Sequence, residues 1–214
     1  MNQEFENNGY FVAREFFDKT TINLLSTYFD IKYRIIKHGD TLGSEYSTMD
    51  RGDVTNSYVF YADHLTESVL FNNGQKMSKL LGLHLTPTYT FARIYEKGQP
   101  LLPHTDRPSC EISATCPIFT SDDKPSTIYV SNFVATEQGR RFSTDEIMAA
   151  GDYTKVDLYP GDVMFYKGCE RYHWRLPLES DYLVQFFMHT VRVDGEYSEY
   201  TLDKRPYLGF KKNS

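Results

Sequence analysis

The order of hydrophobic and polar positions divides the chain into a helical first part and a strand-rich second part. A helix is predicted from Asp18 or Thr20 to about Lys37, because apolar residues recur there three and four positions apart. A second helix is predicted from its cap at Thr66 to Gly82, on the same pattern. The apolar face of the first helix comprises Ile22, Leu25, Phe29 and Tyr33.

After the second helix the chain breaks into short alternating segments separated by turn residues. Strands are predicted over 10–14, 88–95, 110–118, 127–133, 163–166 and 182–193, with 59–61 as a strand or the start of a helix. A short helix is predicted over 144–150, and Lys97-Gly98 and Pro160-Gly161-Asp162 are typical turns. Helices followed by about seven or eight short strands favour a mainly β fold, a barrel or sandwich supported by N-terminal helices.

We expect a single domain over residues 1–214, because no repeat, linker or low-complexity tract interrupts the sequence. Its helical support would occupy about 15–85 and its β core about 86–195. Residues 38–56 are polar, contain three glycines and show no period, so we predict a long loop. With Tyr46, Met49 and Arg51, that loop would be suited to close over a substrate.

Composition and charge exclude several classes of function. The net charge is −6 and the basic residues are scattered, which argues against binding of nucleic acid. No apolar run reaches the roughly 18 residues of a membrane span, and the N-terminal residues are too polar for a signal peptide. Cys110, Cys116 and Cys169 form no CxxC pair and are odd in number, which favours reduced thiols. We therefore expect a cytoplasmic protein without nucleic-acid or membrane partners.

The candidate chemistry lies in His104-Thr105-Asp106 and, far downstream, in His173. Side chains two apart in an extended chain project to the same side, so His104 and Asp106 can bind one metal ion. Two histidines and one carboxylate form the facial triad of non-haem Fe(II) oxygenases. A structural alternative is a loop hydrogen bond between His104 and Asp106 with His173 in the core. Among other possible ligands His189 is the main rival, since the cysteines lack zinc spacing.

From about Tyr89 to Val193 the sequence resembles the 2-oxoglutarate and Fe(II)-dependent dioxygenases of the prolyl-4-hydroxylase-like branch, and it is similar to bacterial and phage-encoded members. The segments that carry the resemblance are Tyr95 with Gly98, His104-Thr105-Asp106, Arg107 to Ser113, Pro160-Gly161-Asp162, Gly168-Cys169-Glu170 and His173-Trp174-Arg175. The resemblance implies a double-stranded β-helix (jelly roll, cupin-like). It also implies Fe(II) bound by His104, Asp106 and His173, with 2-oxoglutarate and O2 as co-substrates.

One departure concerns the cation that pairs with the far carboxylate of 2-oxoglutarate. Where the hypoxia-sensing members carry a basic residue, this chain has Asp181-Tyr182-Leu183. A buried dicarboxylate needs a cationic partner, and Arg175, two residues after His173, would face the same interior side. The alternative for Arg175 is a surface salt bridge, for example with Glu179. Arg93 and Arg192 are reserve candidates for the cation.

Several polar residues share the expected interior with the metal ligands. Arg107 would orient Asp106 or contact the substrate, unless it is a solvated loop residue. The remaining candidates for binding the co-substrate are Tyr95, Ser113, Thr115 and Gln185. Tyr95 lies two residues after Arg93, and the resemblance implies that it points toward the co-substrate or the substrate. The alternative is that Tyr95 only packs in the core.

The resemblance implies a hydroxylase that releases succinate and CO2. Because Asp106 occupies a metal position that chloride would need, the triad favours hydroxylation over halogenation. A prolyl residue of a peptide or protein is the first expected substrate, and a free amino acid or other small metabolite is the second. Other classes remain: a non-catalytic jelly-roll binding module, or a cupin-like metalloenzyme that does not use 2-oxoglutarate. The position of Arg175, inside or outside the barrel, separates these alternatives, and the oligomeric state stays open.

Overall fold

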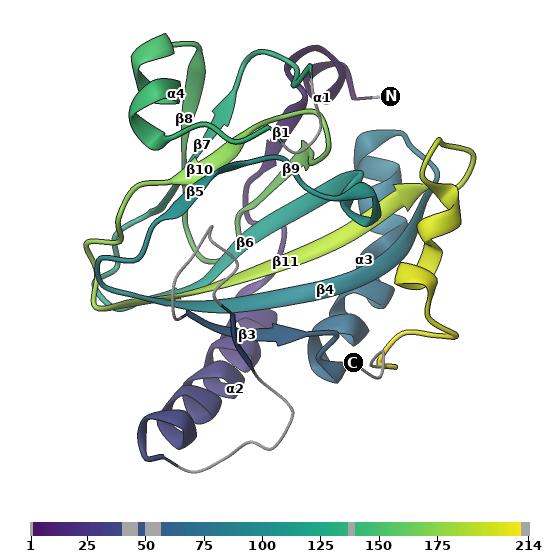
Figure 1. Ribbon diagram of the computed structural model, residues 1–214. Helices are drawn as coiled ribbons and strands as arrows, with labels where there is room; N and C mark the ends of the chain where they lie inside the picture. The colour runs from purple at the N-terminus through teal and green to yellow at the C-terminus, as the bar shows by residue number, and fades with distance from the viewer. Residues whose placement is uncertain (1, 40–46, 50–56, 137–139, 211–214) are drawn as a thin grey trace.

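Two antiparallel sheets form the centre of the structure, a computed structural model that describes residues 2–39, 47–49, 57–136 and 140–210. The large sheet comprises, in spatial order, β1 (Tyr10–Ala13), β9 (Val163–Lys167), β6 (Ile112–Thr120), β11 (Tyr182–Arg192), β4 (Leu85–Glu96), β3 (Ser57–Tyr61) and β2 (Ser47–Met49). The small sheet comprises β5 (Leu101–His104), β10 (His173–Arg175), β7 (Ser126–Ser131) and β8 (Tyr153–Leu158). The sheets face each other as in a jelly roll (Figure 1).

Two long helices cover the face of the large sheet that is turned away from the small sheet (Figure 1). Helix α2 (Lys19–Lys37) begins after the cap Asp18, whose carboxylate accepts a hydrogen bond from the Thr21 amide. Helix α3 (His64–Leu81) begins after Asp63 and ends at Gly82. The predicted cap Thr66 is wrong: the Asp63 carboxylate accepts from two amides of the first turn, and Thr66 is helical.

Alternation along the central strands creates two different faces. The helix-side face carries the main apolar core, which includes Ile94 of β4, Ala114 of β6 and Phe186 of β11. Between the sheets the same strands bury polar residues, among them Arg93 on β4 and Gln185 on β11, which stand opposite each other in the register. The fold therefore places a polar interior inside an otherwise apolar framework.

The prediction of a mainly β fold with N-terminal helices is confirmed. The helices over 18–37 and 144–150 are present as α2 and α4 (Thr144–Ala150), and a further helix, α1 (Gln3–Asn8), opens the described chain. The 59–61 segment is strand β3. Strands β1 to β3 belong to the large sheet, although they precede the predicted β core in the sequence. Among the described residues, no helix combines the length and apolar character needed to cross a membrane.

Several expectations about local structure differ from the structure. The strand predicted from Cys110 begins at Ile112, because Pro108–Cys110 forms a short 3-10 turn, η2. Strand β5, which ends at His104, was not predicted, and neither were β8 and β10. The predicted loop over 38–56 contains β2, while Tyr46, Arg51 and most of that loop lie outside the described residues. A last 3-10 segment, η3 (Ser198–Lys204), packs on β4 and β11.

Candidate metal centre

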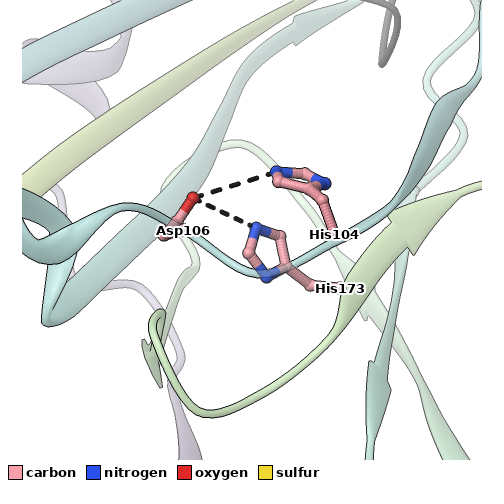
Figure 2. Close-up of side chains that lie close together, drawn as sticks. All are labelled: His104, Asp106 and His173. Carbon is pink, nitrogen blue, oxygen red and sulfur yellow. Dashed lines mark ion pairs between the residues drawn. The ribbon is translucent and has the colours of Figure 1, made fainter. Parts of the chain in front are cut away.

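Strand pairing brings the three predicted metal ligands together (Figure 2). Strands β5 and β10 run antiparallel with His104 directly opposite His173, although the two are far apart in sequence. Asp106 follows β5, and its backbone N–H donates to the Gly168 carbonyl at 2.8 Å. The Asp106 Oδ1 atom lies 3.8 Å from His104 Nε2 and 3.5 Å from His173 Nε2. One ligand atom from each residue therefore fits around a single ion.

Neighbouring groups orient all three side chains. The His104 Nδ1 atom lies 2.8 Å from the Leu102 carbonyl, and His173 Nδ1 lies 3.1 Å from the Arg171 carbonyl. Because a carbonyl can only accept, each ring can carry a proton on Nδ1, which would leave the lone pair of Nε2 free for a metal ion. Such second contacts fix the tautomer of metal-binding histidines. The arrangement thus has the donor chemistry that Fe(II) requires.

Asp106 is held as a carboxylate. Burial by itself would raise its pKa, but His173, through its charge and hydrogen bond, and the charges of His189 and His104 lower the pKa well below its usual range. Its second oxygen, Oδ2, accepts a hydrogen bond from the Ser113 hydroxyl at 2.8 Å. An ionised, oriented carboxylate facing two imidazoles fits a divalent cation.

The backbone at Gly168 leaves no room for a side chain next to the metal site. A Cβ at this position would lie 2.5 Å from Asp106 Oδ2 and 2.9 Å from Ser113 Oγ, and it would also clash with the Cys110 carbonyl. Two of these three groups orient or form the carboxylate ligand. The absence of a side chain at Gly168 therefore lets the β9–β10 connection pass directly behind Asp106.

A second set of possible ligands, Asp106 with Cys110 and His189, is less suited to iron. The Cys110 thiol lies 3.0 Å from the Tyr89 hydroxyl, and burial raises the pKa of this thiol well above its usual value. A protonated thiol is a poor ligand. His189 Nδ1 lies 2.9 Å from the Ser113 hydroxyl, and burial lowers the pKa of its imidazole to about 4. His189 therefore remains a neutral neighbour of the triad in our assignment.

The three ligands open into a cavity of about 340 Å³ between the sheets. Its walls are aromatic and basic rather than acidic. In addition to the ligands they comprise Tyr89, Phe91, Arg93, Tyr95, Leu101, Thr105, Arg107, Cys110, Arg141, Tyr166, Phe187 and His189. A polar site with aromatic side chains in its walls suits a small ligand.

Arg175 lies inside the jelly roll. It is 4% exposed, and its guanidinium donates to the Thr127 carbonyl, the Ser126 hydroxyl and the Gln185 side chain at 3.1, 3.1 and 3.3 Å. Its Nη1 atom is buried without a hydrogen-bond partner. Burial, with a smaller contribution from the charge of Arg93, lowers its pKa. The surface salt bridge considered for Arg175 is not formed, since Glu179 instead pairs with Lys124.

The other predicted polar residues also face this interior. Gln185 donates to the Thr115 hydroxyl at 2.6 Å while it accepts from Arg175, so these three side chains form one connected group. The Tyr95 ring centroid lies 4.9 Å from the Arg175 guanidinium carbon, and the buried Tyr95 hydroxyl has no hydrogen-bond partner. Tyr95 lines the metal cavity, whereas Arg175 lines a separate cavity of about 280 Å³.

Two arginines have other partners. Arg192 pairs with Glu111 at 2.5 Å, so this reserve candidate already has a carboxylate partner within the protein. Arg107 donates to both carboxylate oxygens of Asp203 at 2.7 and 2.9 Å rather than to Asp106, and 44% of its side chain stays exposed to solvent. Asp203 also accepts from Ser109 and Tyr61. Nothing in the local sequence indicated this partner, which comes from the C-terminal segment η3.

This chain is similar to known proteins in structure but not in sequence. No family model matches the sequence, and no curated protein matches it at a significant level. A prolyl-4-hydroxylase from Pseudomonas putida is 14% identical over 87% of this chain and 95% of its own, with a TM-score of 0.59. HygX from Streptomyces hygroscopicus, solved with nickel, 2-oxoglutarate and hygromycin B, is 12% identical over 91% and 88%, with a TM-score of 0.61.

AviO1 from Streptomyces viridochromogenes is 12% identical over 90% of this chain and 94% of its own, with a TM-score of 0.69. All three comparisons cover most of this chain and most of the matching chain. The resemblance that the sequence indicated is thus confirmed at the level of architecture. The chain has the jelly-roll fold of the 2-oxoglutarate-dependent, prolyl-4-hydroxylase-like enzymes.

Proposed function

We propose that this protein is an Fe(II)- and 2-oxoglutarate-dependent dioxygenase that hydroxylates its substrate and releases succinate and CO2. The observation that carries the proposal is the combination of two features in one interior. The first is the triad of His104, Asp106 and His173, with Asp106 Oδ1 within 3.8 Å of both imidazoles. The second is the buried Arg175, whose guanidinium contacts no carboxylate among the described residues.

The triad would hold the ferrous ion through two neutral nitrogens and one carboxylate oxygen. When bound, iron and 2-oxoglutarate supply the oxygen-activating chemistry that side chains lack. The chain's own contribution is to fix the ligands. The Leu102 and Arg171 carbonyls orient the two imidazoles, and the Ser113 hydroxyl holds Asp106 Oδ2. Facial ligation of this kind leaves adjacent positions open for a bidentate co-substrate and O2.

Arg175 would pair with the far carboxylate of 2-oxoglutarate. A buried cation without a counterion is costly, and a carboxylate of the co-substrate would provide one. The Arg175 Nη1 atom and the Tyr95 hydroxyl are both buried without a hydrogen-bond partner, and a carboxylate bound beside them would supply one. Ser126, Gln185 and the Thr127 carbonyl hold the guanidinium in place, and Thr115 holds Gln185.

Two substrate classes have support from the comparisons. Likeness to the P. putida prolyl-4-hydroxylase supports a prolyl residue of a peptide or protein. Likeness to HygX, solved with hygromycin B, supports a small molecule such as a free amino acid or other metabolite. The interior position of Arg175 favours both over a non-catalytic binding module and over a cupin-like enzyme that does not use 2-oxoglutarate.

The decisive experiment is an anaerobic titration of the apo-protein with Fe(II) and then with 2-oxoglutarate, followed by the visible charge-transfer band of the chelated co-substrate. We expect a band in the wild type and a dissociation constant for 2-oxoglutarate raised at least about tenfold by Arg175→Met, because a charged hydrogen bond is lost. Arg192→Met is the matched control and should leave the constant unchanged. Iron binding without any band would contradict the proposal, and a band insensitive to Arg175→Met would transfer this role to Arg93.

A further inference from the structure

Arg93 is a second buried arginine of the interior, and the proposed function does not use it. It lies on β4, opposite Gln185 in the register and two residues before Tyr95. Its side chain is 5% exposed and lines the same cavity as the three metal ligands. Two of its nitrogens, Nε and Nη1, are buried without a hydrogen-bond partner. A guanidinium carries five N–H donors, and buried donors are usually hydrogen-bonded to the protein, to water or to a ligand.

The described residues offer Arg93 no counterion. Within the described parts of the chain, no carboxylate lies within ion-pair distance of Arg93. Its guanidinium carbon instead lies 5.3 Å from the Phe91 ring centroid and 5.6 Å from that of Tyr95. Arg107, in the wall of the same cavity, is neutralised by Asp203. Aromatic contacts stabilise a cation by far less than its desolvation costs.

The bound metal and co-substrate would not neutralise Arg93 either. In formal charge, a ferrous ion and Arg175 together balance Asp106 and the dianion of 2-oxoglutarate. The charge of Arg93 is then left over, and the exposed Arg141 in the cavity wall adds to it rather than offsetting it. A loaded site would therefore carry excess positive charge next to the place where a substrate binds. That imbalance favours a substrate with a negative charge.

We propose that Arg93 binds a carboxylate of the primary substrate, which is therefore a small carboxylic acid such as a free amino acid. This inference rests on the proposed function and selects between its two substrate classes. An internal prolyl residue of a protein carries no charge to pair with Arg93, whereas a free carboxylate matches the fork of a guanidinium in two parallel hydrogen bonds. The cavity of about 340 Å³ is also of a size for a small ligand.

The test uses the protein loaded anaerobically with Fe(II) and 2-oxoglutarate and four matched pairs of probes: acetate, L-alanine, L-proline and L-leucine, each with its primary amide. Binding is followed as a shift of the charge-transfer band, so turnover is not required. For at least one pair we expect the acid to bind the wild type at least about tenfold more tightly than the amide, the effect of a charge-assisted bidentate pair. Arg93→Met should abolish that preference, and Arg93→Lys should restore part of it.

Control measurements keep the outcomes distinct. The dissociation constant for 2-oxoglutarate should change less than about twofold in Arg93→Met, because Arg175 is intact. Arg93→Gln serves as a second neutral variant if Arg93→Met folds poorly by circular dichroism. Acids and amides that bind alike, or no Arg93-dependent response at about 10 mM probe, would overturn the inference. Loss of 2-oxoglutarate binding in Arg93→Met would assign Arg93 to the co-substrate, and no band in the wild type would reject the proposed function itself.

Discussion

The two faces of the large sheet are built from the same strands and differ in what they bury. On the helix side Val184, Phe186 and Met188 of β11 pack into the main apolar core. On the inner side Gln185 and His189 of the same strand are also buried, but they point toward the metal cavity and the arginines. Apolar burial stabilises a fold, whereas buried polar groups cost stability unless they find partners. The strands thus derive their stability from one face and present chemistry on the other.

Hydrogen bonding shows the same difference. On the helix side the buried Thr90 hydroxyl bonds to Thr66 of α3 at 2.6 Å, and the ammonium of Lys32 pairs with Asp63 at 2.9 Å. On the inner side Arg93, Tyr95 and Arg175 each retain a buried polar atom without a partner. A sheet that satisfies polar groups on one face and leaves them open on the other is arranged to receive ligands on the open face.

The largest effect is expected from a truncation on the helix-side face. Phe186 is fully buried in the main core, so Phe186→Ala should lower the free energy of unfolding by about 3–5 kcal/mol through lost burial and a cavity. Urea unfolding of the metal-free protein measures this loss. Phe186→Leu, a smaller change at the same site, is the milder variant. A loss below about 1 kcal/mol would show that this face does not dominate stability.

A change behind the metal ligands should affect metal binding rather than folding. Ser113→Ala removes the hydroxyl that bonds to Asp106 Oδ2 at 2.8 Å, and we expect the affinity for Fe(II) to fall about 10- to 100-fold. Competition with a chelator under anaerobic conditions measures the affinity. Thr115→Val, two residues along the same strand and on the same face, is the control, since Thr115 bonds to Gln185 and not to a ligand. Equal losses in both variants would contradict a specific role for Ser113.

Replacement of the buried, charged Arg93 by a neutral residue should stabilise the metal-free protein. Arg93 is 5% exposed and has no carboxylate partner among the described residues, so Arg93→Met removes a desolvated charge at similar volume. We expect the free energy of unfolding to rise by about 1 kcal/mol, measured by urea unfolding. Arg107→Met is the opposite control, because Asp203 would lose its partner, and it should be destabilising. If Arg93→Met destabilised the protein, the contrast between the two faces would be wrong.

The sequence predicted the parts of the molecule that depend on local pattern. Helix α2 follows from its apolar spacing, and the proximity of His104 and Asp106 follows from their separation by two residues in extended chain. Strands β5 and β10 were missed because four and three residues show no period, yet their pairing is what sets His104 opposite His173. Contacts between residues distant in sequence cannot be inferred from local alternation.

The buried arginines Arg93 and Arg175 show that the sequence does not predict side-chain partners. Arg175 was placed on the interior by counting two residues from His173, and Arg93, two residues before Tyr95, was a reserve candidate; both are buried. Which of their nitrogens would be left unpaired depends on Ser126, Thr127 and Gln185, which come from other strands. The pairing of Arg107 with Asp203 likewise requires the fold of the C-terminal segment. Side-chain partners across a jelly roll are set by register, which the sequence does not show.

The smallest effect is expected at the exposed start of α2, on the helix side of the large sheet. The Thr21 amide donates to the Asp18 carboxylate at 2.7 Å, and this hydrogen bond lowers the pKa of Asp18 below its ordinary value of 3.8. A carboxylate whose pKa is lower in the folded protein stabilises it above pH 3.8, and that contribution is lost as the pH falls through the folded pKa.

Asp18→Asn keeps a capping side chain but removes this charge from the start of α2. We therefore expect the variant to unfold at slightly lower urea concentration than the wild type at neutral pH, and the gap to close as the pH falls below 3.8. Fe(II) affinity should not change, because α2 packs on the face opposite the metal cavity. A gap that persisted in acid would show that capping geometry rather than charge accounts for the loss. A change in Fe(II) affinity would show that the two faces of the sheet are energetically coupled.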